Sequence, residues 1–126
     1  MERTVIYSPG APKPVGPYSQ AIKTGNTLYV SGQLPMVPET GEMISDDIAK
    51  ATDRVMKNIW SILNTAGMDF SNVIKCSIFV TNLNDFPIIN ATYEKFFEYD
   101  APARETIEVK ALPKGAIVEI SCIAVE

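Results

Sequence analysis

The chain has 126 residues, of which 46% are hydrophobic and 21% charged, a composition typical of a folded globular protein. Its formal net charge is −4, and its eleven basic residues are dispersed, so the sequence offers no block of positive charge for nucleic acid. Histidine is absent, which excludes Ser-His-Asp and Cys-His catalysis and disfavours a catalytic zinc site.

The start of the sequence lacks the apolar segment of a signal peptide, and no apolar run is long enough to span a membrane. The length fits one domain over residues 1–126. We therefore expect a single-domain cytoplasmic protein that makes no membrane contact.

The first third of the chain has the pattern of short strands and loops. Residues 3–9 suggest a short strand that Pro9 ends, and the segment 10–17 is so rich in Pro and Gly that it predicts a structured loop. Residues 18–35 then predict a β-hairpin, with its turn at Gly25-Asn26 and its return strand around 28–30.

The clearest helix is predicted over residues 46–66, where apolar side chains recur at helical spacing. Ser45 or Asp46 is expected to cap its start, and Gly67 to end it. Trp60 is expected to widen its apolar face, and Arg54 to face solvent.

The second half predicts a strand over 73–80, a helix over 86–99 capped by Asp85, and two closing strands around the turn 112–115. The order of these elements indicates an α+β fold, with one mixed sheet and two helices on one of its faces.

The last strand, residues 116–125, is apolar at both alternating sets of positions. A strand of this kind is buried on both faces of its sheet. Two helices can cover only one face, so we expect a second copy of the chain to cover the other.

Two charged residues in the closing strands are candidates for chemistry. Arg104 follows a stiff Pro-Ala approach, and a guanidinium can bind a carboxylate through two parallel hydrogen bonds. Glu119 interrupts an apolar strand, where a carboxylate can orient water or move protons. An ordinary surface arginine and an edge-strand charge are the alternatives. If Ala111 pairs with Ala116, Arg104 and Glu119 share a face but lie roughly 13 Å apart, so either the register differs or they meet between subunits.

Other residues carry weaker signals. Tyr18 follows a rigid Pro/Gly loop and Ser31 precedes a glycine, which is more often the context of a packing anchor and a turn residue than of a catalyst. Cys76 and Cys122 match no metal or redox spacing, and we expect both to be reduced core thiols.

Four segments together resemble the RidA family, also called the YjgF family, of reactive-intermediate deaminases. Their order along the chain is that of the family, and the resemblance covers nearly the whole length. The segments are GPYSQAI (16–22), YVSGQLP (29–35), NATYEKFF (90–97) and PARETIEVKALPKGAIVEISCIAV (102–125).

The resemblance implies a chorismate-mutase-like α+β fold and a homotrimer with clefts between subunits that bind small carboxylates. It implies cofactor-independent hydrolysis of 2-enamine and 2-imine acids, such as 2-aminoacrylate and 2-aminocrotonate, to 2-keto acids and ammonia. It implies that Arg104 binds the substrate carboxylate, that Glu119 positions the attacking water, and that Tyr18 and Ser31 complete the pocket. The chain departs from the archetypal pattern at Thr106, where those members have Cys. The backbone amide of Thr106 is still expected to bind substrate, but the changed side chain leaves the preferred substrate open.

Three alternative functions remain open. The same pocket would serve a non-catalytic protein that binds 2-keto acids and regulates a partner. Some family members carry the label of translation inhibitor or ribonuclease, which the acidic balance and the missing histidine weigh against. The third alternative is a chaperone-like protein that holds unfolding clients.

Overall fold

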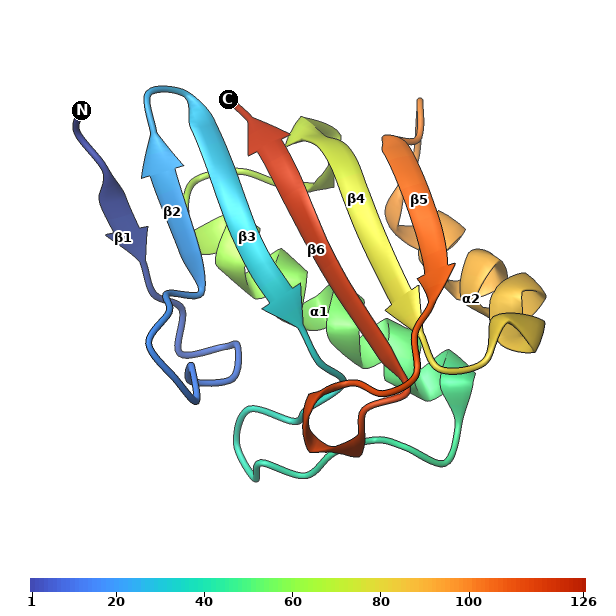
Figure 1. Ribbon diagram of the computed structural model, residues 1–126. Helices are drawn as coiled ribbons and strands as arrows, with labels where there is room; N and C mark the ends of the chain where they lie inside the picture. The colour runs from blue at the N-terminus through green and yellow to red at the C-terminus, as the bar shows by residue number, and fades with distance from the viewer.

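The computed structural model describes residues 1–126 and consists of one six-stranded mixed sheet with two α-helices, as the α+β prediction requires (Figure 1). The helices are α1 (Ile48–Thr65) and α2 (Phe86–Tyr93). The strands are β1 (Thr4–Ile6), β2 (Ala21–Thr24), β3 (Thr27–Gln33), β4 (Val73–Val80), β5 (Ala103–Glu108) and β6 (Val118–Val125).

The strands lie in the order β1-β2-β3-β6-β4-β5. All neighbours are antiparallel except β4 and β5, which run parallel. The last strand therefore lies in the middle of the sheet, between two strands from earlier in the chain. The two closing strands do not pair with each other, through Ala111 and Ala116 or in any other register, because β4 lies between β5 and β6.

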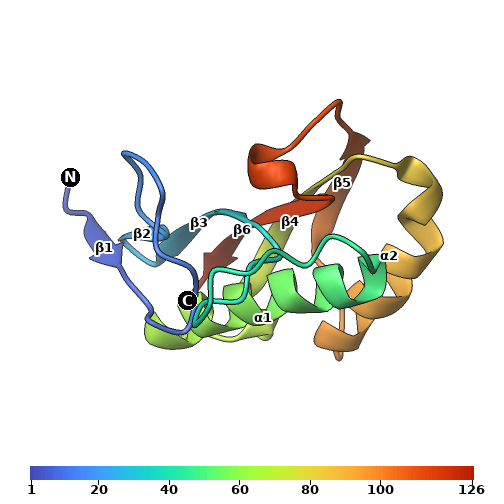
Figure 2. The same cartoon turned by 90° about the horizontal axis from the view of Figure 1, so that it is seen from below.

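Both helices pack on the same face of the sheet, as predicted (Figure 2). The core lies between the helices and the sheet. It includes alternate residues of β6, among them Val118, Ile120 and Cys122, each at most 4% exposed. Cys76 lies opposite Cys122 in the β4–β6 ladder, and both are buried free thiols, which confirms the expectation for the cysteines.

The helix α1 forms where the apolar spacing predicted it, but its ends differ in detail. Asp47, not Ser45 or Asp46, caps its start, by accepting a hydrogen bond from the backbone N–H of Lys50 at 3.0 Å. Gly67 follows its end with a φ of 77°, a left-handed conformation that costs glycine little.

Two side chains of α1 differ from expectation. Trp60 does not join the apolar face but is 48% exposed. Arg54 is half-buried instead of solvent-facing. A helix stripe that serves the core spans only part of the circumference, and Trp60 falls outside it. Arg54 is partly covered because it lies in a hollow that Thr92 and Lys95 also line.

The helix α2 is shorter than the predicted span 86–99. It ends at Tyr93 and continues as a single 3₁₀ turn, Glu94–Phe96. Phe96 and Phe97 both pack on Phe70, with ring centroids 5.3 and 5.4 Å away. Asp85 forms no side-chain hydrogen bond that caps the helix, because it already has helical backbone angles as the last residue of a preceding 3₁₀ turn.

Neither α1 nor α2 covers the opposite face of the sheet, here called the open face (Figure 2). A row of apolar side chains crosses it, since β1, β2, β3 and β6 place Val5, Ile22, Tyr29 and Ile123 side by side. Val5 is 58% exposed and Tyr29 50%. The sequence therefore predicts correctly that the outward set of β6 residues has no intramolecular partner.

The Pro-rich loop before β2 is ordered by one buried side chain. The carboxamide of Gln20 accepts a hydrogen bond from the N–H of Ser8 at 2.6 Å and donates to the carbonyl oxygens of Ser8 and Pro12 at 3.0 Å each. This amide replaces the backbone pairing that prolines cannot provide. The prediction of a structured loop is confirmed.

No helix of the structure combines the length and apolar character needed to cross a membrane.

Candidate functional site

Arg104 lies near the start of β5, the edge strand, and its side chain points to the helix face of the sheet. Its neighbour in the ladder is the buried Cys76. The guanidinium carbon lies 5.0 Å from the ring centroid of Tyr93 and 5.5 Å from that of Phe86, both on α2. A cation over aromatic faces is attracted by the ring quadrupole, which holds the guanidinium without neutralising its charge.

No carboxylate competes for this guanidinium. Arg104 is absent from all three ion pairs of the structure. The adjacent Glu105 points to the opposite face, where it pairs with Lys75 at 3.1 Å and accepts a hydrogen bond from Ser77. These two partners lower the pKa of Glu105, with Ser77 the larger cause. The donors of Arg104 are therefore free for an external anion.

A further polar group near Arg104 also lacks a partner. The hydroxyl of Thr106, two residues along the same strand face, is buried and forms no hydrogen bond. Burial raises the pKa of Tyr93, with the Cys76 thiol as a smaller cause. Thr106 thus offers a hydroxyl on the same face as the guanidinium.

Glu119 lies on the open face, at the position of β6 that pairs with Phe79 of β4. Partial burial raises the pKa of its carboxyl group. The carboxylate lies directly over the Cα of Gly32, so close that a Cβ at residue 32 would meet the Glu119 Cδ at 2.7 Å. Gly32 lies at an irregularity of β3, between the paired residues Val30 and Gln33. The glycine thus makes the room that the carboxylate occupies.

Tyr18 and Ser31 line one surface hollow of about 630 Å³, and Tyr18 and Gly32 line a second, smaller one. The Ser31 hydroxyl donates a hydrogen bond to the carbonyl oxygen of Ser19 at 2.6 Å, which ties β3 to the loop that carries Tyr18. The Tyr18 hydroxyl accepts from the N–H of Val15 at 3.3 Å, and its side chain is 48% exposed.

The candidate residues therefore form two groups. Arg104 and Thr106, here called the arginine group, lie on the helix face of the edge strand. Glu119, Tyr18 and Ser31, here called the glutamate group, lie around Gly32 on the other side of the sheet. Arg104 and Glu119 are two strands and three residues apart in the ladder, which corresponds to roughly 14 Å. Within one chain they cannot touch the same small molecule.

Three residues that matter for this geometry were missed by sequence reasoning. Phe86 and Tyr93 were treated as ordinary helix residues, and Gly32 as part of a turn. A spacing of seven places Phe86 and Tyr93 on one helix stripe, but nothing in the sequence indicates that this stripe faces Arg104. No three His, Cys, Asp or Glu side chains gather where they could hold a metal ion.

Comparison with known proteins identifies the chain's relatives. The family model described as Endoribonuclease L-PSP matches residues 9–126. A RutC family protein of Pyrococcus abyssi is 46% identical over 98% of each chain. The human 2-iminobutanoate/2-iminopropanoate deaminase is 40% identical over 98% of this chain and 90% of its own length.

Solved structures agree in fold. RidA from an Antarctic Psychrobacter superposes with a TM-score of 0.95 at 39% identity, and the match covers 98% of this chain and 99% of that one. TdcF of Escherichia coli, solved with bound serine, gives a TM-score of 0.94 at 36% identity over 98% of each chain. The extent of these matches, in sequence and in structure, shows that the chain belongs to the RidA (YjgF) family.

Proposed function

We propose that this protein hydrolyses 2-enamine and 2-imine acids, such as 2-aminoacrylate and 2-aminocrotonate, to 2-keto acids and ammonia. The single observation that carries the proposal is the Arg104 guanidinium, which two aromatic rings hold while no carboxylate occupies its donors. Deaminase-named relatives at 40% identity or above support this type of reaction.

The role proposed for Arg104 is to bind the substrate carboxylate. A guanidinium offers two parallel donors in the geometry of a carboxylate, so one contact fixes both the position and the plane of the substrate. The hydroxyl of Thr106 adds a donor on the same side. Fixing the substrate places its C=N carbon, and positioning of this kind can lower a barrier by several kcal/mol.

The role proposed for Glu119 is to hold and activate water. An enamine first becomes an imine when its carbon takes a proton, from water or from the Tyr18 hydroxyl, and its nitrogen gives one back to that donor. Water then adds to the C=N carbon as Glu119 accepts one of its protons and passes it to the nitrogen, which gives a carbinolamine. Glu119 next takes the proton of the new hydroxyl and delivers it to nitrogen, so the C–N bond breaks, the C=O bond forms, and ammonia leaves the keto acid behind. No metal or cofactor enters this balance.

We further propose that the site is completed between subunits of a homotrimer in the cytoplasm. The separation of the arginine group from the glutamate group supports this, since one copy can bring its edge strand to the glutamate group of the next. The uncovered apolar row on the open face gives a reason for the copies to associate.

The decisive experiment is a coupled assay in which a pyridoxal-phosphate dehydratase generates the imine. Disappearance of the imine is recorded with and without this protein at matched buffer composition, because the imine also hydrolyses unaided. Acceleration that is proportional to protein concentration supports the proposal. An unchanged rate, with ammonia release equal to the protein-free control, refutes it.

A second candidate is a protein that binds small amino or keto acids without turnover. The serine in the TdcF structure favours this alternative, because it is a bound small carboxylate. Calorimetric binding of 2-ketobutyrate by a protein that leaves the imine lifetime unchanged would identify the binding function. Cleavage of RNA by the purified protein, which the family description Endoribonuclease L-PSP suggests, is tested in the same preparation.

A further inference from the structure

A cluster of basic side chains lies on the outer surface of the two helices, away from the arginine and glutamate groups. Lys50, Arg54 and Lys57 follow one another at spacings of four and three residues and so form one stripe of α1. Lys95, from the turn after α2, lies across from them. All four side chains line one hollow of about 400 Å³. The fold therefore brings together basic residues that are scattered along the sequence.

The positive charge of this hollow is not balanced within the chain. Asp53 is the one carboxylate that lines it, and Asp53 is already paired with Lys57 at 2.9 Å. Lys50, Arg54 and Lys95 take part in none of the ion pairs. The Nε of Arg54 is buried and has no hydrogen-bond partner. The unpaired charges of Lys50, Arg54 and Lys95 therefore make this hollow attractive to an anion.

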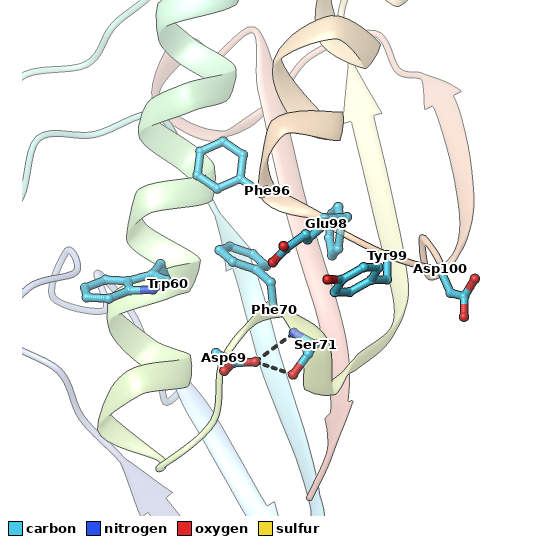
Figure 3. A pocket seen from close by; sticks show the side chains of 9 residues that line it. Trp60, Asp69, Phe70, Ser71, Phe96, Glu98, Tyr99 and Asp100 are labelled. Carbon is cyan, nitrogen blue, oxygen red and sulfur yellow. Dashed lines mark hydrogen bonds between the residues drawn. The ribbon is translucent and has the colours of Figure 1, made fainter.

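A second hollow, of about 620 Å³, continues from the first. It shares Arg54, Lys57 and Lys95 with it and adds the aromatic side chains of Trp60, Phe70 and Phe96. Figure 3 shows Trp60 projecting from α1, with Phe70 and Phe96 to one side of it. The half-exposed indole offers a flat apolar face beside the cations, a surface suited to stacking by an aromatic ring.

The surface charge changes from positive to negative beyond these aromatic residues. Trp60, Phe70 and Phe96 also line a third hollow, of about 540 Å³, together with Asp69, Glu98 and Asp100 (Figure 3). Hydrogen bonds from Ser71 lower the pKa of Asp69 and keep it charged. A long polyanion such as RNA that followed the strip would meet these carboxylates, whereas a small molecule would end before them.

We propose that this surface binds a nucleoside phosphate. The phosphate groups lie in the hollow between Lys50, Arg54 and Lys95, and accept hydrogen bonds from their terminal ammonium and guanidinium groups. The base lies against Trp60 in the adjoining hollow. Because the lining residues belong to neither candidate group of the deaminase site, the binding is independent of the proposed reaction.

The experiment uses the fact that Trp60 is the single tryptophan of the chain. Adenosine diphosphate is titrated while tryptophan fluorescence is recorded, and calorimetry is run in parallel. Adenosine diphosphate is expected to quench Trp60 saturably. Adenosine, which lacks the phosphate groups, and inorganic pyrophosphate, which lacks the base, are each expected to bind at least about ten-fold more weakly.

The variants separate the two halves of the site. Arg54→Gln and Lys95→Gln are each expected to weaken binding of adenosine diphosphate about five- to ten-fold, and Lys110→Gln, a matched loss of one exposed positive charge elsewhere, to leave it unchanged. Trp60→Phe, followed by calorimetry, is expected to weaken binding of adenosine diphosphate about five-fold and leave that of pyrophosphate unaltered. Raising the salt concentration is expected to weaken binding of adenosine diphosphate in the native protein and less in Arg54→Gln.

Several outcomes would overturn the proposal. They are absence of saturable binding at millimolar adenosine diphosphate, equal binding of adenosine, equal binding of pyrophosphate, or equal affinity in the Arg54→Gln and native proteins. Much tighter binding of an RNA oligonucleotide, with a salt dependence that indicates more phosphate contacts than these cations can make, would assign the surface to RNA instead.

Discussion

The guanidinium of Arg104 lies over the ring of Tyr93, 5.0 Å from its centroid, with the ring of Phe86 at 5.5 Å. An arginine held by ring faces keeps an uncompensated charge and most of its donors. A carboxylate partner would instead neutralise that charge and occupy the donors. This arrangement prepares the side chain for an anion from outside the chain.

Replacement of Arg104 tests its role directly. Arg104→Ala is expected to abolish imine turnover and to weaken binding of 2-ketobutyrate by about 2–5 kcal/mol, the usual cost of losing one partner of a desolvated charge pair. Arg104→Lys is expected to restore little, because an ammonium lacks the planar fork. Calorimetry with 2-ketobutyrate gives the affinities. The melting temperature is expected to fall by no more than about 5 °C, since only the two cation–π contacts to Tyr93 and Phe86 are lost. Native-like binding by the alanine variant would make the arginine structural.

The aromatic support of Arg104 is tested at Phe86, which is 38% exposed and can change without opening the core. Phe86→Leu removes a ring face but keeps an apolar side chain of similar size. We expect the KM for the imine to rise about three- to ten-fold with a smaller change in kcat, because the guanidinium is less well oriented before substrate binds. Leu83→Ala, a truncation at a 43% exposed position nearby in the chain, is the control. Equal KM values in both variants would exclude an orienting role.

Glu119→Gln keeps the volume of the side chain and removes its charge. The hydrolysis rate is expected to fall about 100-fold or more, the usual size of acid–base effects, with little change in keto-acid affinity. Burial raises the pKa of Glu119, so the active carboxylate forms only above the ordinary range of glutamate. In the native protein the rate should therefore fall as the pH drops through this raised pKa. A pH–rate profile of Glu119→Gln that keeps the same acid limb would assign the limb to another group.

The raised pKa of Glu119 also predicts a dependence of stability on pH. The folded protein binds the proton more tightly than the unfolded chain, so ionisation opposes folding above the unfolded pKa. Glu119→Gln is thus expected to melt at a higher temperature than the native protein at pH 7. The difference should vanish below the ordinary pKa of a glutamate, where both states of the native protein are protonated. Thermal melts of the two proteins from pH 3.5 to 7 measure this, and a constant difference would contradict it.

Gly32→Ala tests the contact between Gly32 and Glu119. The new Cβ would overlap the carboxylate of Glu119, so the side chain has to move and the hydrolysis rate falls. Overpacking of this kind costs about 1–3 kcal/mol of stability. In a Glu119→Ala background the same substitution should cost much less, because the obstructing group is gone. Chemical denaturation of the four proteins of this cycle gives the coupling free energy, and additive costs would show that the two residues do not interact.

Association through the open face is tested at Ile123, the member of the apolar row that lies on the central strand β6. The native chain, of 13.8 kDa, is expected to sediment as a trimer at micromolar concentration, with interfaces larger than about 1,000 Å². Ile123→Glu places a charge in that interface and is expected to dissociate the assembly or prevent folding. Circular dichroism distinguishes these two results. A stable native monomer in sedimentation equilibrium would refute the proposed assembly.

Most of the fold is predictable because its signals are local. The helical spacing in α1, the glycine that ends it and the alternation in β6 depend on neighbours within a few residues. The pairing of β5 failed because adjacency in sequence suggested a hairpin, whereas β4, an earlier strand, separates β5 from β6. No local signal records which strand inserts between two others.

The candidate site also has some features that the sequence indicates locally and others that depend on distant segments. Arg104 and Glu119 stand out in the sequence because charges in apolar strands require an explanation. The rings beneath Arg104 and the space that Gly32 leaves for Glu119 depend on α2 lying beside β5 and on β3 lying beside β6. Such contacts join distant segments, so a single sequence gives no sign of them. The separation of the two groups across the sheet follows from the same insertion of β4.

The central position of β6 has a consequence for how the protein folds during its synthesis on the ribosome. Its ladder with β3 pairs Thr27 with Val125, so this contact closes a loop that includes most of the chain. Closing long loops slows folding, and a ribosome adds only about 5–20 residues per second. For several seconds after β3 and β4 emerge, each therefore presents an unpaired edge that only β6 can occupy. Such edges recruit other strands. The newly made chain is accordingly most exposed to aggregation before its synthesis reaches Val125, and a pause in translation between β5 and β6 would prolong that interval.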